Sequence, residues 1–427
     1  MHVLLVPVGS SGDVHPFIAM GCALRDRGHQ VTMIVHAHFE PLVRRVGLPC
    51  RAVGEAEQYD AAASDPDLWH PRKGLEVVAR LGAEMIRPVY DLVNELLPAA
   101  GQTVIVAAGL AFGARIAAEK HGFSLATVHL QPNCLWSAYE APAFPHLTMP
   151  RWWPPPVKRL MYRIADWTAD RVFGPAINSF RSELGLPPAR RLLHEWWHSP
   201  DLILGLFPSW YAPPQPDWPP PTQLTGFPLY DEGDVAAMPA DAEQFLRDGE
   251  RPIVCTPGSA NQHGQQFFEA IAWACQRLGR RGILLTRYPK QIPKQLPPGV
   301  VHFDYIPFSR LLPRAAALVH HGGIGTMAQG MAAGLPQLLM PMGFDQPDNA
   351  ARIRRLGIGT SIKPKSFRGP RVARALAKLL ASKEVAERAQ SVAGKIHGAS
   401  PLDQTCEAIE ELAGRVSSSR AQTHHHR

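Results

Sequence analysis

Hydrophobic and polar positions along the chain follow two alternating periods. Short apolar runs rich in aliphatic and β-branched residues precede longer segments in which apolar residues recur at helical spacing, which is typical of parallel βαβ units. The candidate strands form two groups, 2–7, 31–35, 103–107 and 125–129 in the first half and 253–256, 282–286, 300–304, 317–320 and 337–341 in the second. The pattern predicts an α/β fold with two doubly wound parallel-sheet domains in tandem, which suits a chain of 427 residues.

Proline marks the boundary between the two groups. Segment 211–221 holds six prolines, and such a run excludes a helix or a central strand. We therefore expect an N-terminal domain over 1–211, a linker over 212–222, a C-terminal domain over 223–405, and a terminal helix with a disordered tail over 406–427. A second proline-rich patch, 142–156, precedes an amphipathic stretch, 157–173, and is expected to be an insertion on the ligand-binding side of the first sheet.

Charge and cysteine content narrow the class of protein. The net charge is +7, but the arginines occur in pairs and never in a long basic run, so a solvated face is favoured and nucleic acid is not an expected partner. The six cysteines form no C-x-x-C pair and are expected to be buried thiols. The sequence has neither a signal-peptide pattern nor an apolar run of about 20 residues, so we expect a cytoplasmic protein.

A glycine-containing turn follows the first strand at residues 9–17, GSSGDVHPF. Its opening onto a helix suits an anion or a polar ligand. A dinucleotide site is disfavoured because the G-x-G-x-x-G spacing is absent and the second strand ends without an acidic residue. Asp13 and His15 are candidates for a general base. A helix N-cap is the alternative role for Asp13, and this motif alone favours the cap.

The strongest motif is HHGGIGT at 320–326, between a strand and a helix expected to begin near Met327. Three glycines allow close approach of a ligand to the backbone, and a helix N-terminus carries about half a positive charge. Together with Thr326, these features predict a diphosphate cradle. The lysine of a Walker loop is absent, which disfavours nucleoside triphosphate hydrolysis. The alternative is an ordinary strand-to-helix turn.

A third loop, GFDQPDN at 343–349, follows the strand at 337–341. Ligands bind at the carboxyl ends of parallel strands. Asp345 and Gln346 could therefore bond sugar hydroxyls. In the alternative interpretation, Asp345 caps a helix that runs from Asn349, and on this loop alone that alternative is slightly favoured.

The ordered motifs resemble those of a known family. They are GSSGDVHP at 9–16, LTGFP at 224–228, PGS at 257–259, YIP at 305–307, HGGIGT at 321–326 and FDQPDNA at 344–350. The chain is similar to the inverting nucleotide-sugar glycosyltransferases with the GT-B fold, in particular the bacterial and fungal branch that glycosylates natural products, sterols and lipids. The motifs span most of the chain.

The resemblance implies two facing Rossmann-like domains, with the acceptor held by the first, the nucleotide-sugar donor by the second, and the chemistry between them. Asp13 matches the acceptor-activating base, and His15 is the second candidate. The expected donor diphosphate ligands are Gly258, Ser259, His321, Gly323, Gly325 and Thr326. Tyr305 and Ile306 match the nucleobase segment, and Asp345 and Gln346 match the pair that bonds the transferred sugar.

The resulting hypothesis is an inverting transferase that uses a UDP- or dTDP-sugar and a small hydrophobic acceptor. No metal and no further cofactor is expected, because helix N-H groups and His321 meet the leaving charge, and Asp65-Pro-Asp67 is interpreted as a solvated loop. The tryptophans Trp152, Trp153, Trp196 and Trp197 fit an acceptor pocket, peripheral membrane contact, or plain packing. The alternatives are a noncatalytic nucleotide-sugar-binding activator and a sugar-nucleotide epimerase.

Overall fold

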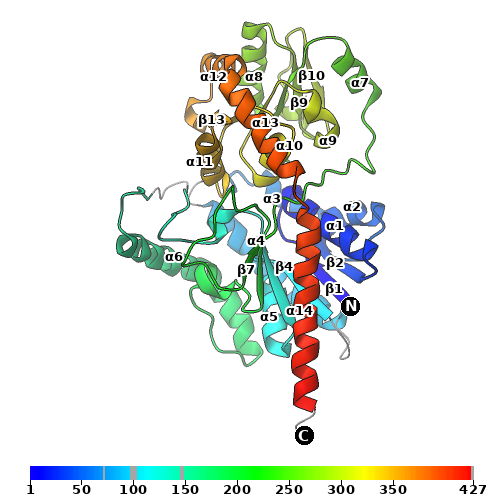
Figure 1. Ribbon diagram of the computed structural model, residues 1–427, viewed down its shortest axis with the longest axis vertical. Coiled ribbons are helices and arrows are strands. Elements are labelled where there is room, and N and C mark those ends of the chain that lie inside the picture. Colours follow the sequence, from blue (N-terminus) through cyan, green and yellow to red (C-terminus); the bar gives the residue numbers. More distant parts are fainter. Residues whose placement is uncertain (71–72, 97–102, 145–148, 425–427) are drawn as a thin grey trace.

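The computed structural model describes residues 1–70, 73–96, 103–144 and 149–424. Two parallel sheets, one above the other in Figure 1, form the centres of two α/β domains. No described helix is long and apolar enough to cross a membrane. The two parallel sheets confirm the predicted α/β fold class with two doubly wound domains.

The first sheet has seven parallel strands in the order β3-β2-β1-β4-β5-β6-β7. The strands are β1 His2–Val6, β2 Gln30–His36, β3 Cys50–Val53, β4 Thr103–Ala108, β5 Ser124–His129, β6 Leu202–Gly205 and β7 Thr222–Leu224. The helices are α1 Ser11–Asp26, α2 Glu40–Arg45, α3 Ala56–Ser64, α4 Gly74–Leu96, α5 Phe112–His121 and α6 Pro155–Glu183. Two apolar clusters, one on each face of the sheet, form the core of this domain.

The second sheet has six parallel strands in the order β10-β9-β8-β11-β12-β13. The strands are β8 Ile253–Thr256, β9 Gly282–Leu285, β10 Val300–Phe303, β11 Ala317–His320, β12 Gln337–Leu339 and β13 Gly359–Ser361. The helices that follow the first domain are α7 Ala240–Arg247, α8 Gln265–Leu278, α9 Phe308–Leu311, α10 Ile324–Ala332, α11 Gln346–Leu356, α12 Gly369–Ala381, α13 Lys383–His397 and α14 Pro401–His424.

The strand orders fix where a ligand can bind. The chain reverses its winding direction between β1 and β4 in the first sheet and between β8 and β11 in the second. A crevice opens at the carboxyl ends of the strands at such a switch point, because the neighbouring connections leave in opposite directions. The loops after β1, β8 and β11 carry the three glycine motifs at 9–12, 258 and 322–325.

The chain crosses between the domains at two places. The proline-rich segment 212–222 leads into β7, an edge strand of the first sheet where proline is tolerated, so the first crossing follows Leu224. Helix α14 then returns along the first domain, as Figure 1 shows, and packs on α1. Its residues Cys406 and Ile409 belong to the first core, and Arg27 binds Asp403 at 2.8 Å. Of the expected disordered tail, 425–427 lie outside the described residues.

Candidate active site

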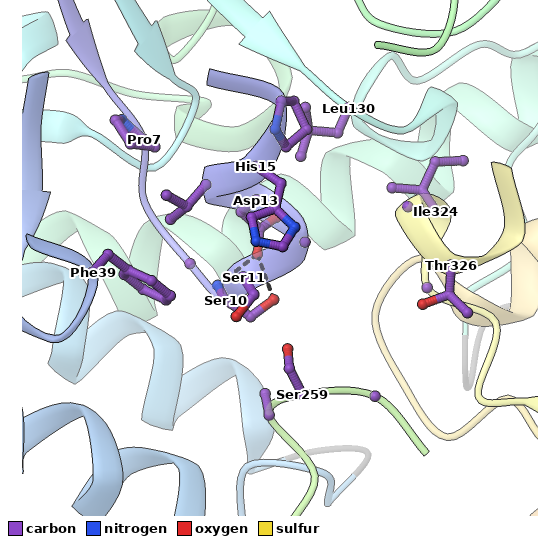
Figure 2. A pocket seen from close by; sticks show the side chains of 18 of the residues that line it. Pro7, Ser10, Ser11, Asp13, His15, Phe39, Leu130, Ser259, Ile324 and Thr326 are labelled. Carbon is purple, nitrogen blue, oxygen red and sulfur yellow. Dashed lines mark hydrogen bonds between the residues drawn. The ribbon is translucent and has the colours of Figure 1, made fainter. Parts of the chain in front are cut away.

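A cavity of about 550 Å³ lies between the two domains. It is lined by the turn after β1, the first turn of α10, the loops after β8 and β9, and the loop before α11. Figure 2 shows Ser10, Ser11 and Asp13 on one side of it, with Ile324, Thr326 and Ser259 opposite. The cavity therefore brings together residues from both halves of the chain.

Asp13 lies in the first turn of α1. Ser10 occupies the N-cap position and Asp13 is the N3 residue of a capping box, so Asp13 does cap the helix, but from N3 and not from the predicted N-cap position. The carboxylate of Asp13 reaches back and accepts hydrogen bonds from the Ser10 backbone N-H at 2.7 Å and from its hydroxyl at 3.0 Å. Glycine is required at position 9, because its φ is +133° and a Cβ there would lie 2.3 Å from Oδ2 of Asp13. Burial raises the pKa of Asp13, and the bonds from Ser10 offset part of that rise.

His15 has an acidic partner that sequence reasoning missed. Its Nε2 lies 3.3 Å from Oε1 of Glu232, and its ring packs edge-on against Tyr230. Glu232 is buried and also lies 3.3 Å from Arg45 and 3.9 Å from Arg287. Burial raises the pKa of Glu232, but the adjacent His15 ring and these positive charges outweigh burial and hold the pKa below its usual value. His15 therefore lies against Glu232, which belongs to the segment between β7 and α7 that joins the two domains.

The cradle motif forms the start of α10, three residues earlier than predicted. Gly323 is the N-cap and the helix begins at Ile324, so Gly325 and Thr326 lie in the first turn and present N-H groups to the cavity. A Cβ on Gly325 would lie 4.0 Å from Gly12 at the start of α1. The N-terminal ends of α1 and α10 therefore face each other, and both favour negative charge between them.

Two glycines enclose the ring of His321. A Cβ on Gly258, whose φ is +95°, would lie 2.7 Å from Cε1 of His321, and one on Gly323 would lie 2.4 Å from Nε2. Burial lowers the pKa of His321 to about 4, so the ring is neutral near pH 7. Its buried Nδ1 has no hydrogen-bond partner among the described residues. A buried polar atom of this kind suits a ligand that supplies the missing partner.

The neighbouring histidine has a structural role. Nε2 of His320 lies 2.9 Å from Oε1 of Gln337, and Nδ1 accepts the Gly322 N-H at 3.1 Å. The buried side chain of His320 therefore holds the glycine turn in place. Only the second histidine of the pair lines the cavity.

Asp345 approaches the same point from the loop before α11. It occupies the N-cap position of α11, but its side chain makes no cap hydrogen bond, and the helix begins at Gln346, three residues before the predicted Asn349. The carboxylate instead accepts from Nδ2 of Asn349 at 2.6 Å. Burial, and next the negative charge of Asp13, raise the pKa of Asp345 to about 7. The two carboxylates therefore interact across the domain boundary.

Buried hydrogen bonds hold this loop in place. Tyr211 donates to Oδ1 of Asn349 at 2.8 Å, and Asn349 also donates to Gly322 O at 2.9 Å. Oε1 of Gln346 accepts from the backbone N-H groups of Met342 at 2.7 Å and Gly343 at 3.2 Å. Asn349 thus connects the cradle to the Asp345 loop. Gln346 lines the cavity with its carbonyl oxygen already bonded.

The far end of the cavity carries the residues expected at the nucleobase. The hydroxyl of Tyr305 donates to Asp231 O, and the guanidinium of Arg287 lies 5.0 Å from the centre of the Tyr305 ring. Ile306 is fully buried in the core beneath it. Ser259 is exposed beside the cradle, next to Gly258. An aromatic ring with a cation over it offers a flat surface on which a base can stack.

Another part of the cavity is apolar and is formed by α4 with nearby loops. Its lining includes Leu68, Trp69, Val78, Leu81, Met85, Val89, Leu110 and Leu130. The described part of the predicted proline- and tryptophan-rich insertion, 142–173, contributes no lining residue. Trp152 lies outside the cavity and is 80% exposed, whereas Trp196 and Trp197 pack against the interior of the first domain. None of the four tryptophans singled out from the sequence lines this cavity.

Within the described parts of the chain, no group of three or more His, Cys, Asp or Glu residues could hold a metal ion. Asp65 lies 3.0 Å from Arg80 and Asp67 lies 3.0 Å from Lys73, so both carboxylates of the Asp-Pro-Asp segment make surface ion pairs. This placement agrees with the interpretation of that segment as a solvated loop.

Several lining residues were missed at the level of sequence. Arg287 follows β9 and could have been found by the rule that strand ends carry ligands. Glu232 and Trp69 lie in irregular segments, and no periodicity or motif marks them. Their approach to the cavity depends on the tertiary fold.

Comparisons with known proteins cover both domains. Residues 3–139 match the glycosyltransferase family 28 N-terminal domain, and residues 283–412 match the erythromycin biosynthesis protein CIII-like C-terminal domain. The O-mycaminosyltylonolide 6-deoxyallosyltransferase of Streptomyces fradiae is 32% identical over 97% of this chain and 98% of its own length. A sterol 3-beta-glucosyltransferase of Arabidopsis thaliana is 29% identical over 85% of this chain and 58% of its own length.

A similar fold occurs among solved structures. Glycosyltransferase VinC, crystallised in complex with dTDP, matches with a TM-score of 0.67 and 19% identity, covering 97% of this chain and all of that one. At 19% identity, this match shows that the two proteins share a fold.

Proposed function

From the fact that this chain belongs to the UDP-glycosyltransferase-like family of GT-B glycosyltransferases, we propose that it transfers a sugar from a UDP- or dTDP-sugar to a hydroxyl of a small hydrophobic acceptor, with inversion. The chain is an enzyme that transfers a glycosyl group. The donor, the acceptor class and the stereochemistry are the parts proposed. The observation that carries the proposal is the placement of Asp13 and Asp345 between the facing N-termini of α1 and α10.

Asp13 is the proposed general base. A free aspartate, with a pKa near 3.9, is a weak base for an alcohol. Burial and the nearby Asp345 carboxylate make the ionised pair costly, and removal of an acceptor proton relieves that cost. The acceptor oxygen then attacks the anomeric carbon on the face opposite the leaving group, so the configuration inverts.

The leaving nucleoside diphosphate takes both electrons of the broken carbon–oxygen bond. Its negative charge develops beside the N-H groups of α10, which are fixed before the reaction and require no rearrangement. Neutral His321 can donate a further hydrogen bond from its unpartnered side. Thr326 and Ser259 lie within the same cavity and supply hydroxyl groups.

Donor and acceptor identity follow from the two ends of the cavity. The Tyr305–Arg287 surface suits a pyrimidine base, and a relative of similar fold binds dTDP. The apolar lining from α4 suits a largely hydrophobic acceptor, and the names of two relatives describe transferases that act on O-mycaminosyltylonolide and on a sterol. An epimerase would not need this second compartment, and a noncatalytic activator would not need Asp13.

A donor and acceptor panel tests the proposal. The purified protein is incubated with UDP- and dTDP-sugars and with hydrophobic alcohols, and the products are identified by mass spectrometry. The expected product carries one added sugar, with an anomeric configuration opposite to that of the donor by nuclear magnetic resonance. A product with retained configuration would contradict the mechanism. Binding of dTDP or UDP without turnover of any pair would favour the activator alternative.

A further inference from the structure

One face of α6 is apolar and exposed. Its residues Val157, Leu160, Ile164 and Trp167 recur at helical spacing, and Leu160, Ile164 and Trp167 are each more than half exposed. Trp152, just before the helix, is more exposed still. Monomeric proteins rarely present a contiguous set of large apolar side chains to water.

The opposite face of α6 already packs in the core. Tyr162 belongs to a small cluster with Met149, and Phe173 and Ile177 belong to the core of the first domain. The exposed stripe is therefore a second apolar face, in excess of what holds the helix in place. It lies at the side of the first domain, where α6 projects in Figure 1.

The charges around the stripe are positive. Arg159, Arg163 and Arg171 are exposed, and Arg171 lies 4.2 Å from the centre of the Trp167 ring. The two acidic residues in the same part of the helix face inward. Asp166 is buried, and Asp170 accepts the backbone N-H groups of the turn at 191–192. The exposed face thus combines tryptophan and aliphatic side chains with arginine and has no exposed carboxylate between 155 and 171.

We propose that this face of α6, residues 152–171, docks on the surface of an anionic phospholipid bilayer. Tryptophan is favoured at the boundary between lipid headgroups and acyl chains, and arginine binds the lipid phosphates. A helix of this composition lies in the plane of the interface with its apolar side inserted. A second copy of the chain is a poorer occupant, because a two-fold contact would bring this arginine-bearing face against the same arginine-bearing face of the other copy.

The docking face is connected to the cleft. The segment that leaves β5 passes Tyr139, which has Arg159 5.9 Å from its ring centre, and then Ala143, whose N-H donates to Asp348 of α11 at 3.0 Å. Helix α11 follows directly on Asp345. A bilayer bound at α6 would therefore lie beside the segment 139–143, which contacts α11 near Asp345, and this position suits an acceptor dissolved in lipid.

Vesicle flotation with the full chain tests the proposal. Vesicles of phosphatidylcholine alone are compared with an equimolar mixture of phosphatidylcholine and phosphatidylglycerol, at low and high salt. The expected result is binding to the mixed vesicles that weakens as salt is raised. Trp167→Ser should reduce the bound-to-free ratio several-fold, and the double variant R159E/R163E by about tenfold or more.

Matched variants control for composition and net charge. Trp273→Ser removes a tryptophan that is 43% exposed on α8, and R371E/R374E makes the same charge change on α12. Both should bind the mixed vesicles within about twofold of the original chain. Melting temperatures of all variants establish that each is folded at the assay temperature.

Two results would overturn the proposal. Equal loss of binding in R159E/R163E and R371E/R374E would show that net charge, and not this face, attracts the vesicles. No binding to the mixed vesicles, together with lipid-free self-association in sedimentation that Trp167→Ser abolishes, would assign the face to a second copy of the chain. Neither result depends on turnover, so the transferase proposal is tested separately.

Discussion

Replacing Gly258 by alanine tests the diphosphate cradle. The residue has a φ of +95°, and the added Cβ would lie 2.7 Å from Cε1 of His321. Real Cβ atoms do not approach other atoms so closely, so the His321 ring must move away from its position between Gly258 and Gly323. We expect the cradle to lose the contact between this imidazole and the donor diphosphate.

The magnitude has two parts. A left-handed conformation costs a residue with a Cβ about 1–2 kcal/mol, which should appear as lost folding stability. A hydrogen bond to a charged group contributes about 1.5–3 kcal/mol, which corresponds to about 10- to 100-fold weaker binding of the nucleoside diphosphate. The two parts appear in different measurements.

Gly279→Ala is the matched control. Gly279 ends α8 with a φ of +62°, and a Cβ there would meet nothing within 4 Å. It should cost a similar amount of stability and leave ligand binding unchanged. Isothermal titration calorimetry with UDP and dTDP, and thermal unfolding, are measured for both variants. If Gly258→Ala binds both nucleotides as tightly as Gly279→Ala does, His321 does not contact the diphosphate and this part of the reasoning is refuted.

Three further predictions concern named groups. His15→Asn should lower kcat by less than about tenfold, because His15 is directed toward Glu232; a loss as large as that of a missing base would transfer the role to His15. Asp345→Asn should raise the melting temperature at pH 8 and have little effect near pH 4. Because the pKa of Asp345 is raised to about 7 in the folded protein, the folded state binds more protons than the unfolded state between about pH 4 and pH 7. The stability of the original chain therefore falls as the pH rises through this window, and the asparagine variant avoids that loss. A melting-temperature difference that grows toward acid would contradict that sign. Arg181→Ala should cost about 1–3 kcal/mol in denaturant unfolding, because it removes a buried side chain and leaves the Pro187 carbonyl oxygen without the N-H that binds it at 2.8 Å; a cost below about 0.5 kcal/mol would contradict this account.

Much of the fold followed from local pattern. The nine predicted strands all occur, because parallel strands covered on both faces are short continuous apolar runs that stand out from amphipathic helices. The places where the chain crosses between the two domains were harder to predict from the sequence. Strand β7 has three half-buried residues and no apolar run, and α14 joins the first core through Cys406 and Ile409, a contact fixed by tertiary packing.

Site residues could be predicted where their position at the end of a strand was enough to identify them. The rule that ligands bind at strand ends selected the turns carrying Asp13, His321 and Asp345, and the structure brings these three residues to one cavity. Their roles in binding and catalysis stay predictions. Helix starts were placed three residues late at α10 and α11, since glycine and proline in the first turn hide the beginning of a helix from propensity.

The tryptophans do not line the cavity, and there is a physical reason why the sequence could not show this. Tryptophan suits a pocket, a membrane surface and a core equally well, so composition could not choose among them. The lining comes instead from α4, whose apolar residues have the spacing of an ordinary core helix. A helix that lines a cavity has the same sequence pattern as one that packs on a sheet.

The central claim is that Asp13 removes the acceptor proton while the second domain holds the donor. The most direct measurement compares Asp13→Asn with the original chain in two assays, turnover of a donor and acceptor pair and calorimetric binding of the nucleoside diphosphate. We expect turnover to fall by about 10²–10⁴-fold, the usual contribution of a general base, with nucleotide affinity unchanged. Turnover that persists in Asp13→Asn would contradict the claim, because the proton would then leave by another route.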